Sequence, residues 1–326
     1  MSQSRRQFLQ ASLATAAALA ATPAFAARAA TLSSRARVDR ALAGTDVDRQ
    51  PLTLWHHFGL EAKGPAAHAE ATLAFHRRFG TDLVKVMSDF PYPKPASGAW
   101  FELAAEAKPF PAQLEALTAI ASSLGGEAHF VETIFNPWNV AEKLSSPEAV
   151  QQLKREQPQK LLDALEVIAR SEASHAKQAL AAGASGVFLA IANAQPAILA
   201  AEDFARFSEP FDRMILDAVR AAPLNVLHLH GDHVYLDRFY GWPAAAINYS
   251  THGTKVAVAD VRARYPGLLL AGIDEVSYRT LTPAMLKAQA DAARTQAGAK
   301  FLLTPGCSVP NDSTPEELAR LRALFA

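Results

Sequence analysis

This sequence of 326 residues has a single cysteine and no formal net charge, and it lacks the usual glycine-rich motifs of phosphate-binding loops. Its single cysteine, Cys307, excludes an intrachain disulfide bond. Lys plus Arg and Asp plus Glu number 32 each, so there is no basic surplus of the kind that binds nucleic acid or anionic lipid. Neither G-x-G-x-x-G nor G-x-x-x-x-G-K-S/T follows an expected strand, which argues against an open doubly wound nucleotide-binding sheet.

The first 26 residues are interpreted as a cleaved twin-arginine signal peptide. Arg5 and Arg6 precede an apolar stretch at 11–21 and a small-x-small cleavage site at 24–26. That stretch is too short and too rich in alanine to span ~30 Å of hydrocarbon, and no later stretch is typical of a transmembrane helix. We therefore expect an exported, periplasmic protein without an integral membrane segment after cleavage. Residues 27–50 are interpreted as a polar lead-in, with room for one helix packed outside the domain.

From residue 51 onward, short apolar or β-branched runs alternate with longer amphipathic stretches. Half of all residues are apolar, enough to bury the core of a large domain. We expect eight strands, at residues 53–58, 83–87, 128–134, 186–190, 225–230, 245–249, 268–272 and 300–304. Eight βα units are typical of a TIM barrel, and no linker divides residues 51–326. The sequence therefore predicts an α/β fold, a single-domain (β/α)8 barrel.

Polar and titratable residues follow the expected strands, where a barrel places its active site. The most informative group is His228, His230 and Cys307. Residues i and i+2 of a strand point to the same side, and the cysteine follows the last strand, so the three can meet. Two imidazoles and a thiolate would leave a zinc ion one open position, as in catalytic sites. The alternative is two hydrogen-bonded core histidines and a small core cysteine.

Other residues at the strand ends are candidates for proton transfer, orientation and substrate binding. Only one of two adjacent strand histidines can face the interior, where it could act as a base near neutral pH. A lysine inside an apolar strand needs a partner, either a nearby aspartate or a substrate carboxylate. The catalytic candidates are His56, His57, Asp89, Tyr92 and Asp274, and the substrate-binding candidates are Trp55, Lys85, Asn136, Asn248 and Tyr249.

Six segments taken together resemble the uroporphyrinogen decarboxylase superfamily. They lie in the same order along the chain, at residues 54–58, 82–89, 182–188, 227–231, 271–274 and 302–310. The resemblance implies the barrel fold and two known activities. One is decarboxylation without a metal, for which an arginine-rich motif grips the substrate carboxylates. The other is zinc-dependent methyl transfer between a corrinoid and a thiol.

The chain departs from both patterns. No arginine lies between Gln50 and His76, where the decarboxylases carry their motif. His228 and Cys307 match the methyltransferase ligands, whereas His230 stands in the place of a cysteine. An imidazole in place of a thiolate makes the ion more Lewis-acidic and less able to activate a bound thiol.

We predict metal-assisted methyl transfer or decarboxylation on a small methylated, carboxylated or tetrapyrrole-related substrate. Zinc is the expected cofactor, and the resemblance adds a corrinoid as co-substrate. One alternative is a zinc hydrolase, because residues 228–233 spell H-x-H-x-D-H, with Asp232 and His233 as further ligands. Another is a non-catalytic periplasmic binder of a corrinoid or tetrapyrrole. A small molecule is the expected partner, nucleic acid is not, and homodimerisation is left open.

Overall fold

The computed structural model describes residues 31–95 and 98–325. The signal peptide expected at residues 1–26 lies outside them. The chain from Leu32 onward forms one compact unit. None of the helices in the described ranges is both long and apolar enough to cross a bilayer.

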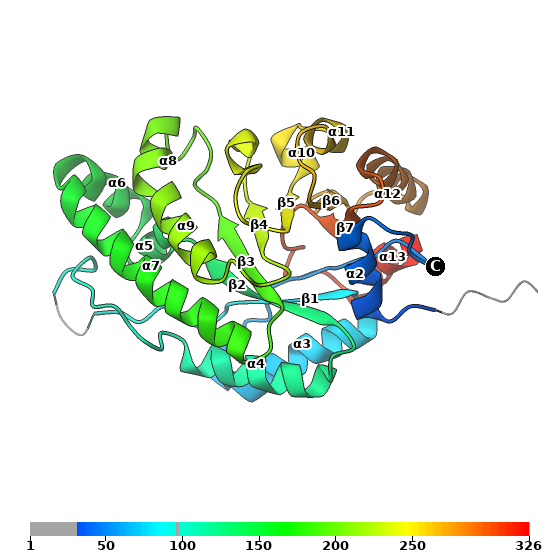
Figure 1. Cartoon of the computed structure of the whole chain (residues 1–326), viewed down its shortest axis with the longest axis horizontal. Coiled ribbons are helices and arrows are strands. Elements are labelled where there is room, and N and C mark those ends of the chain that lie inside the picture. The colour runs from blue at the N-terminus through cyan, green and yellow to red at the C-terminus, as the bar shows by residue number, and fades with distance from the viewer. Residues whose placement is uncertain (1–30, 96–97, 326) are drawn as a thin grey trace, which may run out of the picture. The chain divides into compact units, whose positions relative to one another are not determined.

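A parallel sheet runs through the middle of this unit, with helices arrayed around it (Figure 1). In the described part of the chain it has seven strands, hydrogen-bonded in the order of the sequence. They are β1 (Leu83–Val86), β2 (His129–Phe135), β3 (Gly186–Ile191), β4 (Val226–Leu229), β5 (Ala246–Tyr249), β6 (Leu268–Ile273) and β7 (Phe301–Pro305). All neighbours are parallel, so every strand ends at the same rim. The predicted α/β fold is confirmed, and its sheet is a TIM-like half-barrel.

The prediction of an eighth strand at residues 53–58, closing the barrel, was wrong. The sheet is open between β7 and β1. Just before this stretch, Leu52 forms an isolated bridge with Leu303. Beyond that bridge the backbone has other partners: the Trp55 carbonyl accepts from the amide of Val309, past the end of β7. A regular ladder needs a neighbouring strand in register, and here the neighbour has already become a loop.

The helices pack around the sheet, and most begin with proline in the first turn, where its missing N–H costs nothing. They are α2 (Ser34–Ala43), α3 (Pro65–Phe79), α4 (Pro111–Leu124), α5 (Pro137–Leu144), α6 (Pro147–Glu156), α7 (Pro158–Ala181), α8 (Ala201–Phe207), α9 (Glu209–Ala218), α10 (Thr251–Thr254), α11 (Val258–Arg262), α12 (Pro283–Ala297) and α13 (Pro315–Arg322), with 3-10 turns at Glu61–Lys63, Leu236–Phe239 and Ala323–Phe325.

Side chains alternate in direction along each strand, so the core has two layers, one on each face of the sheet. Leu227 and Leu229 of β4 belong to the larger apolar cluster, which packs beneath the helices, whereas Val226 belongs to the inner cluster. Helix α2 contributes to the inner cluster through Val38 and Ala41, both fully buried. The lead-in helix therefore packs into the inner core, and it contacts β1, β2 and β7.

A buried ion-pair network fastens this lead-in to the start of β1. Asp82 is fully buried and accepts hydrogen bonds from Arg37, Arg49 and the amide of Leu52. Arg37 also pairs with Asp48, and this pairing raises the pKa of the guanidinium. The carboxylate thus joins three segments that are separate in the sequence.

Replacing Asp82 with alanine should lower the free energy of unfolding by about 3–5 kcal/mol, because it leaves the buried Arg37 guanidinium without this partner. Urea unfolding followed by circular dichroism measures the change. Asp217→Ala, which removes an exposed partner of Arg220, is the control and should leave the midpoint unchanged. Equal effects of the two substitutions would contradict the assignment.

Candidate metal site and its cavity

Strand β4 carries the first two residues of the site. His228 lies within the strand, with 5% of its surface exposed, and its ring stacks on Phe188 of β3 with centroids 5.1 Å apart. His230 follows the end of the strand and is exposed at the rim. The residue after it is Gly231, with φ of 110°, a backbone angle that favours glycine and turns the chain sharply at this point.

The orientation of His228 is determined by Asn248 on β5. The Asn248 Nδ2 donates to the Leu270 carbonyl, the Thr304 hydroxyl and the Pro305 carbonyl, so the amide oxygen must face the other way. That oxygen lies 2.6 Å from His228 Nδ1. Since an amide oxygen only accepts, Nδ1 carries a proton, and Nε2 is the nitrogen left to bind a metal ion.

Cys307 arrives from an edge of the sheet, two residues after β7. The turn that carries it packs so closely that a Cβ on Gly306 would come within 2.3 Å of the Ser250 Cα, which explains the glycine. Glu275 supports the same turn, because its Oε2 accepts from the Gly306 amide at 3.1 Å and lies 3.3 Å from the Ser250 hydroxyl. Glu275 is therefore occupied behind the turn and is not part of the metal-ligand group.

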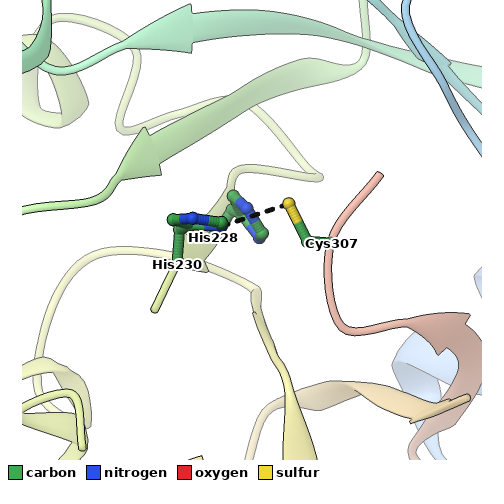
Figure 2. A group of neighbouring side chains, drawn as sticks. All are labelled: His228, His230 and Cys307. Carbon is green, nitrogen blue, oxygen red and sulfur yellow. Dashed lines mark hydrogen bonds between the residues drawn. The ribbon is translucent and has the colours of Figure 1, made fainter. Parts of the chain in front are cut away.

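The three side chains point toward one another (Figure 2). One ligand atom from each lies within 4.8 Å of the others, and His230 Nδ1 is 3.2 Å from Cys307 Sγ. Burial raises the pKa of the Cys307 thiol, but hydrogen bonds and charge from His228 and His230 outweigh it and lower the pKa to about 4. The same hydrogen bond raises the pKa of His230. The geometry favours a thiolate, which is the form that binds metals.

A cavity of about 480 Å³ opens beside this cluster, a volume suited to a small molecule. All three cluster residues line it. Among the other predicted residues, His57, Trp55 and Lys85 line it as well.

The side chains of the adjacent His56 and His57 point in different directions. His57 faces the cavity, and its Nδ1 lies 2.7 Å from Asp89 Oδ1. Burial raises the pKa of Asp89, but its hydrogen bond and charge interaction with His57 outweigh that effect, so the pKa is lowered overall. His56 points away, into an aromatic group with Phe58 and Phe75, where burial lowers its pKa.

Four other predicted site residues do not line the cavity. Tyr92 lies in a separate cavity of about 210 Å³. Asp274 accepts from the amides of Val276 and Ser277 and so shapes a turn. Tyr249 faces the helices, because it alternates with the inward Asn248.

Asn136, the fourth, caps helix α5. Its Oδ1 accepts from the Asn139 amide, and its Nδ2 lies near the Asn193, Ser208 and Asp212 side chains. Because its polar atoms are all engaged, Asn136 supports the fold. It lies one helix turn before residues that do reach the cavity.

The sequence interpretation missed several wall residues. Glu142 and Lys143 reach the cavity from α5, and Met87, Thr133 and Phe135 come from the ends of β1 and β2. Thr133 and Phe135 stand at alternate positions of a predicted strand, so strand periodicity was an available signal. Nothing in the sequence indicated that α5 turns back over the cavity.

Comparison with known proteins agrees with this architecture. The profile of the uroporphyrinogen decarboxylase (URO-D) family matches residues 101–325. A methyltransferase from Methanosarcina mazei has the same fold, with a TM-score of 0.74 and 19% identity over 90% of this chain and 98% of its own. A B12-independent methionine synthase from Shewanella sp. W3-18-1 has a TM-score of 0.60 and 12% identity over 85% and 91% of the two chains. No curated protein matches the sequence.

Alkylation of the single cysteine tests the electrostatics of the site. On protein freed of metal by a chelator, the rate with iodoacetamide should stay level from pH 8 to about pH 5.5, because the thiolate is lost only as pH falls through about 4. In His230→Ala, which lacks one hydrogen bond to the sulfur, the decline should begin at higher pH. A wild-type rate that falls steadily between pH 8 and 6, as an ordinary thiol would, contradicts the assignment.

Proposed function

The chain belongs to the uroporphyrinogen decarboxylase family, and from that premise we propose that it is a zinc-dependent enzyme that transfers a methyl group to or from a small substrate. The observation that carries the proposal is the convergence of His228, His230 and Cys307 at one rim of the sheet. Structural similarity to a methyltransferase and to a methionine synthase supports methyl transfer over decarboxylation.

The donor set suits zinc. Two imidazoles and one thiolate are its usual ligands, and bonds of about 2.0–2.3 Å place ligand atoms within the separation found here. The second shell fits as well, because Asn248 holds His228 in the tautomer that binds a metal through Nε2. Three protein ligands would leave a zinc ion one position for a substrate, and all three residues line the cavity.

A bound zinc ion would supply a Lewis acid at that open position, where it can hold or polarise one atom of the substrate. The residues of the chain provide the rest. Trp55 and Phe135 give the cavity apolar walls, which exclude water from the reacting group. His57 faces the same space and can take up or return a proton at Nε2, because its Nδ1 is held by Asp89.

The hydrolase alternative lacks support from the site. The H-x-H-x-D-H string places only its first two histidines in the metal-ligand group, and Asp232 and His233 are exposed beyond it. The string is interrupted by the turn at Gly231, so its last two residues leave the direction of the strand.

We also propose that the protein is exported to the periplasm through the twin-arginine pathway. The support is the sequence pattern at residues 1–26. This pathway carries folded proteins, so the ion would be loaded before export and a corrinoid co-substrate would be met outside the cytoplasm.

Protein purified from the exported fraction should contain one zinc ion per chain by elemental analysis. Cys307→Ala should lose the ion on dialysis, and Asn248→Ala should bind zinc about 10–100-fold more weakly, because His228 loses its orienting partner. His233→Ala is the matched control and should retain full occupancy. Metal-free wild-type protein that binds a coloured ligand would instead support a non-catalytic binder.

The reaction class is tested with methylcobalamin as donor and a panel of small thiols, amines and alcohols as acceptors. Zinc-loaded protein should transfer the methyl group, which the visible spectrum of the corrinoid records, while the acceptor gives up its proton. His57→Ala should slow the transfer by about 100-fold or more at unchanged zinc content. Release of carbon dioxide from small acids, with no loss of methylcobalamin, would favour decarboxylation.

A further inference from the structure

A buried lysine lines the same cavity as the metal-ligand group. Lys85 lies in the middle of β1, with 7% of its surface exposed, and its side chain faces the inner side of the sheet. An ammonium group removed from water is costly unless it is paired. The ammonium group of Lys85 therefore needs a partner of opposite charge.

The present contacts of Lys85 are weak. Its Nζ lies 2.9 Å from the thioether sulfur of Met87, 4.6 Å from the ring centroid of Phe188 and 5.5 Å from that of Trp55. A thioether is a poor acceptor, and ring faces attract a cation without forming a hydrogen bond to it. Burial lowers the pKa of Lys85 to about 7, and the charges of Cys307, Glu132 and Asp89 oppose that effect only in part.

Every acid that the sequence or the fold brings near Lys85 is already engaged elsewhere. Within residues 31–95 and 98–325, no carboxylate oxygen lies within 4.0 Å of the Lys85 Nζ. The engaged pairs are Asp82 with Arg37 and Arg49, Asp89 with His57, and Glu132 with His175 and Gln113.

We infer that the counter-ion of Lys85 is the substrate, and that the substrate carries a carboxylate which binds this lysine inside the cavity. One ammonium group matches one negative charge, and the rings of Phe188 and Trp55 lie close to it. The inference rests on the proposed function, because it assigns one end of the substrate in the same cavity.

The position of Lys85 also determines how such a substrate would lie. Lys85 and His228 contact the same ring, that of Phe188: its centroid is 4.6 Å from the Lys85 Nζ and 5.1 Å from the His228 ring. Because Lys85 and the metal-ligand group line one cavity, a small acid held at Lys85 by its carboxylate has its other end in the same space as those ligands. Lys85 is therefore a specificity-determining residue, which selects acids and sets the distance from the acid group to the reacting atom.

The test is calorimetric titration of the zinc-loaded full chain with straight-chain carboxylic acids of two to five carbons and with the matching amides. At least one acid should bind, and its amide should bind at least about tenfold more weakly, as should the acid to Lys85→Met. Lys287→Met, which removes an exposed lysine of helix α12 outside the cavity, is the matched control and should bind like the wild type. Urea unfolding provides a second measurement: Lys85→Met should be at least as stable as the wild type, because no internal partner is lost.

The outcomes separate this inference from the metal proposal. Acid binding that survives Cys307→Ala but not Lys85→Met supports the inference even where zinc is absent. Acid binding that is lost in Cys307→Ala and unchanged in Lys85→Met would overturn it, because the carboxylate would then be a metal ligand. Failure of all the acids to bind at millimolar concentration, or marked destabilisation by Lys85→Met, would overturn it as well.

Discussion

The site depends on one constraint, the parallel alignment of strands whose carboxyl ends meet at a common rim. His228 and His230 are 77 or more residues from Cys307 in the sequence, yet β4 and β7 deliver them to the same point. Alternation along β4 turns both histidines to the inner side, and the neighbouring β5 supplies Asn248 at the position paired with His228. A slip of one residue in this register would turn each of these side chains toward the helices.

Stability and chemistry are assigned to different parts of the molecule. The charge network around Asp82 joins α2 to the beginning of β1, away from the rim, and each of its members pairs with at least one other. In the cavity, by contrast, Lys85 contacts only the sulfur of Met87 and aromatic rings among the described residues. At the rim, His230 and Cys307 are hydrogen-bonded to each other. This division is expected of a barrel-like fold, whose functional residues gather at the carboxyl ends of the strands.

The cavity offers three chemical functions within the size of a small molecule: a metal-ligand group, a proton carrier and an unpaired ammonium. Phe188 contacts both Lys85 and His228, and both of these residues line the cavity, so one small substrate can reach both. An unpaired lysine costs stability in the free protein, which is the usual compromise of a binding site.

The sequence by itself predicted seven strands within about one residue, the family and the three residues that meet as a candidate metal-ligand group, because side-chain periodicity and the residues that follow a strand are local properties. Only the tertiary structure decided that residues 53–58 form no full strand, since that depends on the loop after β7. It also decided which of His56 and His57 faces the cavity, and it turned Tyr249 toward the helices. It gave Asn248 and Asn136 supporting contacts. In the part of the chain that the structure describes, it left Lys85 without a carboxylate partner. Each of these outcomes depends on what lies across the sheet from a residue, and contacts between distant segments are absent from any local pattern.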